Sequence, residues 1–219
     1  EAVILPALRA LLPEAAILSE ESGASGQDGG LRWVIDPIDG TTNFAAGLPY
    51  YGICIALADS AGEPVIGVIF NPPTGEMFSA SRGGGAFLNS QPVHVTPTPS
   101  LAQSVLIGGF SIRPEIARRQ LRQWTALMER TRGLRRIGSA AMDLAYVAAG
   151  YADGYWEMAL KPWDVLAGLL LVHEAGGRIS GFSGGTDRLF SGAEMVATNR
   201  LIHDELLAVI AAADAQDRL

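Results

Sequence analysis

The 219-residue sequence is poor in cysteine, in basic residues and in long apolar runs. Its one cysteine, Cys54, cannot form an internal disulfide, and the apolar run around it is typical of a buried strand. With 16 Lys and Arg against 23 Asp and Glu, the chain carries a net charge of −7 and lacks the basic footprint of a nucleic-acid-binding protein. No apolar stretch approaches the roughly 20 residues that span a bilayer. We therefore expect neither a nucleic-acid nor a membrane partner, and a cytoplasmic location.

Hydrophobic residues make up 48% of the chain and charged residues only 18%, which excludes intrinsic disorder. Residues 1–104 form a sheet-rich half in which short apolar runs alternate with turn signals, typical of a large antiparallel sheet. Residues 105–219 alternate strands with helices, which indicates an α/β half. The segment Gly23–Gly30 is predicted to be a flexible loop. No long linker separates the halves, so we expect one compact catalytic unit.

The expected elements follow from these patterns. In the first half, strands are predicted at Ala15–Leu18, Leu31–Ile35, Tyr51–Ala58, Pro64–Phe70 and Glu76–Ala80. In the second half, strands are predicted at Val105–Gly109, Leu134–Ile137 and Asp153–Met158, and helices at Glu115–Arg130, Ala140–Ala149, Trp163–Ala175 and Leu201–Ala212.

The most informative segment is Trp33–Phe44, which reads Trp-Val-Ile-Asp-Pro-Ile-Asp-Gly-Thr-Thr-Asn-Phe. An apolar strand delivers Asp36 and, three residues later, Asp39. The proline between them fixes one backbone angle, so that both carboxylates and the Ile38 carbonyl can face one point. Mg²⁺ binds such all-oxygen groups, and the amides of Gly40–Thr42 offer an anion site if they open a helix. An Asp-Pro turn followed by a helix cap explains either aspartate alone, but not one strand feeding both.

Two further acidic segments strengthen this interpretation. Glu20 follows the apolar run Ala15–Leu18, and Asp164 lies in the first turn of the most apolar helical pattern. A Glu-Glu pair is usually a solvated turn, and an aspartate at a helix start is often only a cap. Each signal is weak by itself, but together with the central motif they supply the carboxylates of a metal site.

These motifs resemble, in the same order, those of the inositol monophosphatase family of Mg²⁺-dependent, lithium-sensitive phosphomonoesterases. The matching segments are Ser19–Ser22, Trp33–Phe44, and Trp163–Gly168 followed by Glu174–Gly177, and the resemblance covers essentially the whole chain. It implies an α/β–α+β fold, the layered αβαβα sandwich of the inositol monophosphatase and fructose-1,6-bisphosphatase type. The N-terminal helical hairpin of that family is expected to be missing from this sequence. The resemblance also implies a homodimer that hydrolyses a small phosphorylated substrate.

The resemblance further implies two to three Mg²⁺ ions per site. Glu20, Asp36 and the Ile38 carbonyl would bind the first ion. Asp36, Asp39 and Asp164 would bind the second, with Asp36 bridging. A third, weaker ion would also rely on Glu20.

The remaining roles are carried over in the same way. The catalytic residues would be Thr41 and Glu20, which orient the attacking water, together with Asp39. The phosphate would bind to Gly40, Thr41 and Thr42. The alcohol portion of the substrate would contact Ser139, Ala140 and Glu157, unless Glu157 is a surface residue paired with Lys161.

Several alternatives remain open. The most favoured substrate is myo-inositol 1-phosphate, but the same chemistry could act on histidinol phosphate, fructose 1,6-bisphosphate, NADP or 3′-phosphoadenosine 5′-phosphate. An inactive binding paralogue is a further alternative. A haloacid-dehalogenase-type phosphatase fits less well, because two residues separate Asp36 from Asp39. Ser19 and Lys161-Pro162 depart from the family pattern, and the second departure lies on the leaving-group side.

Other candidate features have simpler interpretations. The histidines His94, His173 and His203 lie in no motif and are not expected to act in chemistry. Gly83-Gly84-Gly85 lacks the lysine of a nucleotide-binding loop and is predicted to be a turn between strands. The basic cluster Arg130–Arg136 is predicted to be a solvated helix end, with attraction of an anionic substrate as the minor alternative.

Overall fold

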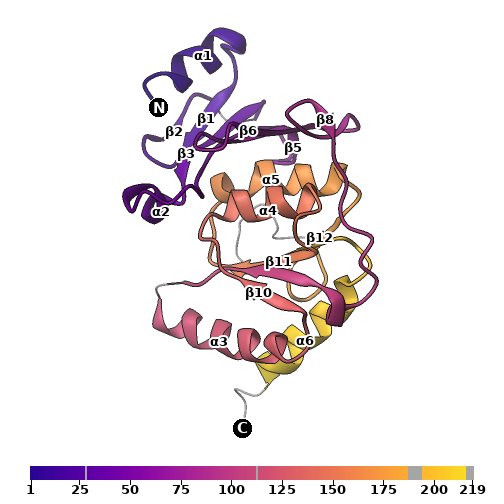
Figure 1. The fold of residues 1–219 in the computed structure, drawn as a ribbon. Helices are drawn as coiled ribbons and strands as arrows, with labels where there is room; N and C mark the ends of the chain where they lie inside the picture. Colours follow the sequence, from indigo (N-terminus) through magenta and orange to yellow (C-terminus); the bar gives the residue numbers. More distant parts are fainter. Residues whose placement is uncertain (28, 112, 187–193, 216–219) are drawn as a thin grey trace.

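A computed structural model describes residues 1–27, 29–111, 113–186 and 194–215. It shows an αβαβα arrangement (Figure 1), which confirms the predicted layered fold. Helix α1 (Ile4–Leu11) covers part of the outer face of the first sheet. Helices α4 (Ala140–Ala148) and α5 (Pro162–Glu174) lie between the two sheets, and α3 (Pro114–Met128) and α6 (His203–Ala215) cover the far side of the second sheet.

In the described part of the chain, the first sheet has eight strands in the order β2-β1-β3-β4-β5-β6-β7-β8. Only β1 and β3 run parallel, and the other neighbours are antiparallel. This agrees with the large antiparallel sheet that the sequence pattern predicted. The strands are β1 (Ala16–Ser19), β2 (Gly23–Ser25), β3 (Arg32–Asp39), β4 (Gly52–Ala58), β5 (Pro64–Asn71), β6 (Glu76–Ser81), β7 (Gly85–Leu88) and β8 (Gln91–Pro92).

The prediction of a loop over Gly23–Gly30 was wrong for its first three residues. Gly23–Ser25 form β2, which pairs antiparallel with β1 at the edge of the sheet. Its residues are largely exposed, and an edge strand with solvent on both faces needs no apolar alternation. The expected turn at Gly83-Gly84-Gly85 is confirmed: it connects β6 to β7, and the Gly84 amide donates to the Ser81 carbonyl at 2.8 Å.

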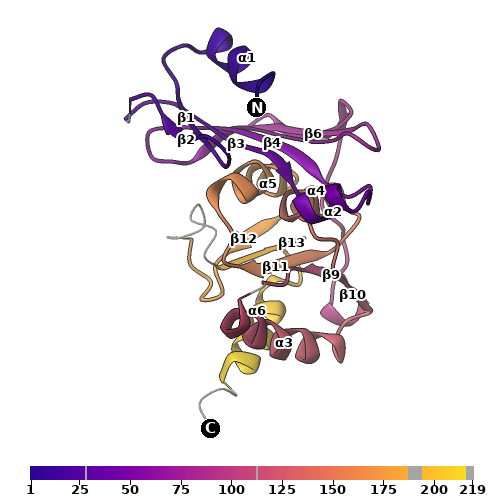
Figure 2. The ribbon, with the colours of Figure 1, turned by 90° about the vertical axis from the view of Figure 1, so that its left-hand side faces the viewer.

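The middle layer of helices lies between the two sheets (Figure 2), and glycines allow it to pack closely against its neighbours. A Cβ on Gly168 of α5 would lie 2.5 Å from the Leu144 Cβ of α4, and one on Gly67 of β5 would lie 2.8 Å from the Ala167 carbonyl oxygen. These contacts are too short for any side chain, so glycine sets the distance of α5 from both α4 and the sheet. The largest core cluster fills this layer and draws residues from both sheets.

The second sheet has five strands among the described residues, in the order β10-β9-β11-β13-β12. Strands β12 (Arg178–Ser180) and β13 (Glu194–Thr198) were not predicted, because they are short and glycines and serines surround them. The other strands are β9 (Val105–Gly108), β10 (Gly133–Arg135) and β11 (Gly154–Met158), close to the predicted ranges. A separate apolar cluster packs α3 and α6 against this sheet.

The division into halves at residue 104 stays a prediction, since the middle layer contacts both sheets. Cys54 is a buried, reduced residue on β4, as its apolar surroundings indicated. In the described ranges, every helix is too short or too polar to cross a membrane.

Candidate active site

The two central aspartates share one face of the sheet because β3 contains an irregularity. Side chains alternate along a strand, so residues three apart would point to opposite faces. Asp36 pairs with Cys54 and Asp39 with Gly52, which means that three steps along β3 match only two along β4. The extra residue re-aims Asp39 to the side of Asp36, which is how a bulge acts next to a functional site.

Local hydrogen bonds hold this irregular segment. The Ile38 amide donates to Asp36 Oδ1 at 2.8 Å, which closes a tight turn around Pro37. Pro37 has no N–H to donate to a strand ladder, so a bulge is one of the few sheet positions that accept it. The sequence argument anticipated the role of the proline but not that the strand continues through it to Asp39.

Asp39 is fixed by the start of α4. Its Oδ2 accepts hydrogen bonds from the Ser139 hydroxyl at 2.5 Å and from the Ala141 amide at 2.8 Å. The Ser139 Oγ also accepts a bond from the Met142 amide at 3.3 Å, as a helix N-cap. Ser139 thus locks Asp39 to α4 and is almost fully buried.

Asp164 reaches the same place from the start of α5. Its Oδ2 accepts the Lys161 amide at 2.7 Å, so the carboxylate does cap the helix. Capping occupies one oxygen and leaves the other free for a ligand. The two interpretations of Asp164 are therefore compatible.

Three carboxylates converge here. Asp36, Asp39 and Asp164 each offer an oxygen that lies within 4.8 Å of the others, and they could hold a metal ion. Burial, then the charge of Asp39, then that of Glu20 raise the pKa of Asp36 well above its ordinary range. Burial also raises the pKa of Asp39 to about 6, against the opposing effect of the Ser139 and Ala141 bonds, and that of Asp164 to about 7.

Such shifts mean that a bare cluster resists ionisation, because desolvation and mutual repulsion disfavour three adjacent negative charges. A divalent cation would remove that repulsion. The donors are all hard oxygens, as Mg²⁺ or Ca²⁺ require and as softer metals do not. The residues present therefore fit a hard-cation centre.

The other two predicted ligands lie beside this group. Glu20 follows β1, its amide donates to the Ile35 carbonyl at 3.1 Å, and its side chain is exposed but close enough to perturb Asp36. It is not one of the three residues whose oxygens lie within 4.8 Å of one another. Ile38 sits in the irregular part of β3, between the two aspartates.

The predicted phosphate-binding residues begin a short helix, α2 (Thr41–Ala45), directly after Asp39. Gly40 has φ of +93°, a backbone conformation that favours glycine, and a Cβ there would also lie only 3.1 Å from that of Ser139. Thr41 and Thr42 are exposed, and first-turn amides have no partner within a helix. Asn43 fixes the helix by donating to the Tyr50 and Ile137 carbonyls at 2.7 and 2.9 Å.

Glu157 is half-buried and not the surface residue that the alternative interpretation expected. The Tyr155 hydroxyl donates to its Oε2 at 2.6 Å, and burial raises the pKa of Glu157 to about 7, against the opposing effects of Tyr155 and Arg136. A Cβ on Gly109 would lie 1.6 Å from the Glu157 carboxyl carbon, so this side chain occupies space that only glycine leaves free. Ala140, the neighbouring predicted contact, is buried at the start of α4.

Sequence reasoning missed Asp143, Tyr155 and Gly109. Asp143 lies on α4, is 1% exposed, and burial followed by the charge of Glu157 raises its pKa well above the ordinary value. The signal for Asp143 was present as one acidic residue in an otherwise apolar helix. Tyr155 and Gly109 gave none, since a tyrosine in a strand and a glycine after one are ordinary.

Comparisons with known proteins agree with this geometry. The model of the inositol monophosphatase family matches residues 1–215. The chain is 43% identical over 215 residues to the inositol-1-monophosphatase of Mesorhizobium japonicum, covering 96% of this chain and 79% of that protein. It is 41% identical over 210 residues to the Nus factor SuhB of Escherichia coli, covering 95% and 78%.

Solved structures give the same result. The extragenic suppressor protein suhB of Bartonella henselae superposes with a TM-score of 0.91 at 39% identity, over 95% of this chain and 80% of that chain. The sequence, the layered fold and the carboxylate group thus agree, and the chain belongs to the inositol monophosphatase family and is a phosphoric monoester hydrolase.

Proposed function

We propose that the protein is a Mg²⁺-dependent phosphomonoesterase that hydrolyses a small polyol phosphate, with myo-inositol 1-phosphate as its preferred substrate. The observation that carries the proposal is the meeting of carboxylate oxygens from Asp36, Asp39 and Asp164 within 4.8 Å of one another, in a site that is buried at Asp36 and half-buried at Asp164. Strand β3 supplies two of these carboxylates and helix α5 the third, while the start of α4 holds Asp39 in place. A helix cap or a turn requires no such meeting of charges. The likeness to proteins named inositol-1-monophosphatase supports the substrate class.

Glu20, Asp36, Asp39, Asp164 and the Ile38 carbonyl would hold two to three Mg²⁺ ions. When bound, the ions would lower the pKa of the attacking water and neutralise charge on the phosphoryl group. Asp39 cannot swing away, because Ser139 and Ala141 hold one of its oxygens. Such locked carboxylates keep the site in one geometry during turnover.

The residues around the carboxylates would bind the substrate. Thr41 and Glu20 would orient the water, and the amides of Gly40, Thr41 and Thr42 would donate to the phosphate. Glu157, with Ser139 and Ala140 beside it, would contact the leaving alcohol. Ser139 would also hold Asp39, to which its hydroxyl donates at 2.5 Å.

A phosphate-release panel tests the proposal. Protein treated with EDTA should lose activity, regain it with Mg²⁺, and be inhibited by millimolar Li⁺. The panel should contain myo-inositol 1-phosphate, histidinol phosphate, fructose 1,6-bisphosphate, NADP and 3′-phosphoadenosine 5′-phosphate. Full activity in chelator would contradict the metal site, and a clear preference for another compound would overturn the substrate alone.

We also propose a homodimer in the cytoplasm, on the strength of the family resemblance. Sedimentation or light scattering would measure the mass, and a monomer at micromolar concentration would contradict the dimer. Fractionation of the source cells would test the location.

A further inference from the structure

A second charged region lies at the other end of α5. Here a cavity of about 910 Å³ opens between β5, α5, β12 and the turn after β13. Its lining includes Arg82, Arg178 and Arg200, together with His173 and one carboxylate, Glu63. In a protein with a net charge of −7, three arginines at one concave place stand out.

This cavity is distinct from the carboxylate site. Asp164 is in the first turn of α5 and His173 is in the last. Nine residues of helix separate them, which is about 13 Å along the axis at 1.5 Å per residue. The apolar residues Leu169 and Leu170 line the cavity floor from the same helix.

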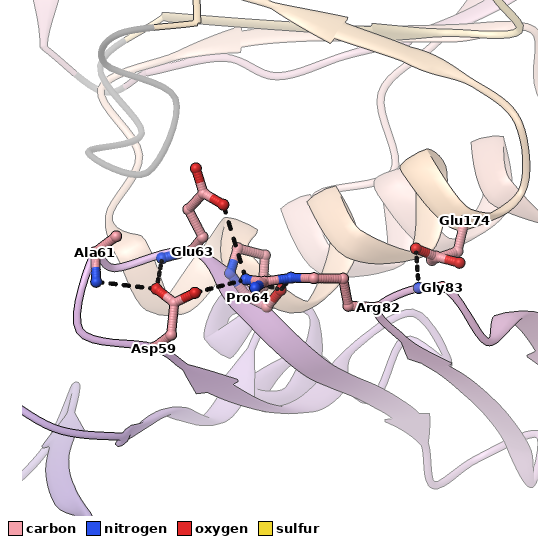
Figure 3. A network of polar contacts seen from close by, with 7 residues as sticks. All are labelled: Asp59, Ala61, Glu63, Pro64, Arg82, Gly83 and Glu174. Carbon is pink, nitrogen blue, oxygen red and sulfur yellow. Dashed lines mark hydrogen bonds and ion pairs between the residues drawn. The ribbon is translucent and has the colours of Figure 1, made fainter.

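Two of the arginines are held in place by ion pairs. Figure 3 shows Arg82, whose Nη2 lies 2.9 Å from Asp59 and 3.8 Å from Glu63, and which also donates to the Pro64 carbonyl at 3.0 Å. Beside it, Glu174 accepts the Gly83 amide at 2.8 Å and so ties the end of α5 to this turn.

Arg178 and Arg200 line the same cavity. Arg178 pairs with the exposed Asp204 at 2.8 Å. Arg200 is exposed and, among the residues that the structure describes, has no carboxylate within ion-pair distance. Its backbone takes the left-handed conformation, with φ of +78°, and its amide donates to the Thr198 hydroxyl at 3.1 Å.

We propose that this cavity binds a small anion that carries two phosphate groups. Guanidinium groups suit phosphate oxygens because they donate paired hydrogen bonds in one plane, and here three of them come from separate segments. A diphosphate would bridge Arg200 to Arg82 and Arg178 and supply the negative charge that Arg200 lacks. The volume falls within the range typical of small-molecule sites, and its concave shape does not suit a nucleic-acid duplex.

Calorimetric titration with inorganic pyrophosphate in EDTA and low salt tests the proposal. Chelator keeps the anion out of the carboxylate site, where uncompensated negative charge repels it. The wild-type protein should bind one pyrophosphate, and Arg200→Gln should weaken the affinity at least tenfold. Arg9→Gln, which removes an exposed arginine on α1, should change it less than twofold.

Two further variants complete the design. Asp164→Asn should bind pyrophosphate as the wild type does, because it alters only the other end of α5. Arg178→Gln should also weaken binding, with circular dichroism and the melting temperature showing that both arginine variants fold. Failure of the wild type to bind, equal affinity in Arg200→Gln, or loss of binding in Asp164→Asn would each overturn the proposal. None of these outcomes depends on phosphatase activity, so the proposed function is tested separately.

Discussion

One end of α5 gathers carboxylates and the other gathers arginines, most of which are paired with carboxylates. At the N-terminal end, the half-buried Asp164 meets the buried Asp36 and Asp39. At the C-terminal end, Arg82 and Arg178 are partly exposed and each has a carboxylate partner. The helix macrodipole favours these signs at both ends. The macrodipole, however, explains only one aspartate at the first end and one cation at the second. It does not explain three carboxylates or three arginines.

The two ends differ in how far their charged side chains are exposed to solvent. Exposed arginines are screened by water and salt, so their repulsion costs little. Buried carboxylates have no such screening, and the raised pKa values of Asp39 and Asp164 show the cost. The carboxylates of the acidic end therefore need a bound cation to offset their repulsion. The arginines of the basic end need no ligand for stability.

The largest expected effect comes from breaking the acidic end. Asp164→Asn should lower turnover by on the order of 10²-fold or more, because it removes one charged ligand of the proposed metal site. The fold should persist, since asparagine can still accept the Lys161 amide as a cap. Steady-state phosphate release and thermal melting measure the two effects.

Asp204→Asn is the matched control for this variant. It removes an aspartate from the exposed pair with Arg178 and should leave turnover within twofold of wild type. If Asp164→Asn behaved in the same way, the carboxylate would be a helix cap and nothing more.

Much of this acidic end could be predicted from the sequence. The order of the motifs indicated which residues matter, and the short spacing from Asp36 to Asp39 indicated that they act together. The bulge in β3 could not be predicted, because it depends on the register with β4 rather than on β3 itself. The same limit explains β2, β12 and β13, whose pairing with neighbours outweighs their own weak strand patterns.

The residues around Glu157 show a second limit. Gly109 and Glu157 are 48 positions apart and come together only because β9 and β11 are adjacent in the second sheet. Neither residue carries a local signal for the other. The basic cavity is similar, since Arg82 follows β6 of the first sheet, whereas Arg178 and Arg200 lie in and just after strands of the second sheet, and the three share no motif.

A smaller effect is expected behind the basic end, at His203. Its ring is buried between the Ser180 and Thr198 hydroxyls, at 2.8 and 2.9 Å. Burial, followed by the charge of Arg178 and against that of Asp204, lowers its pKa from 6.5 to about 4. Between these values the unfolded chain binds a proton that the folded chain excludes. The contribution of the neutral His203 ring to the free energy of unfolding is therefore fully present above pH 6.5. It falls, by at most about 3 kcal/mol, as the pH approaches 4.

Urea unfolding from pH 7 to pH 4.5 measures this slope. The raised pKa values of Asp39 and Asp164 act in the opposite direction, so the test is the difference between variants rather than the wild-type curve alone. His203→Gln should lose stability at pH 7 but show a flatter dependence below pH 6.5, and His173→Gln, on the exposed side of α5, should keep the wild-type slope. Parallel curves for His203→Gln and the wild type would show that the ring is not the group that titrates.

The smallest expected effect separates recognition from chemistry at the acidic end. Glu157 lies next to the carboxylate group but is not part of it, and Tyr155 and Gly109 fix its position. Glu157→Gln keeps the shape and can still accept the Tyr155 hydroxyl. Polyol phosphates should lose roughly 1–2 kcal/mol of transition-state binding, the scale of one charged hydrogen bond, while p-nitrophenyl phosphate, which has no hydroxyl groups to bind, should change little.

Mg²⁺ activation should stay the same, and Glu14→Gln, an exposed residue after α1, should affect neither substrate. An equal loss of kcat/KM on myo-inositol 1-phosphate and on the aryl phosphate would place Glu157 with the metal ligands instead, and no loss on either would remove it from the site.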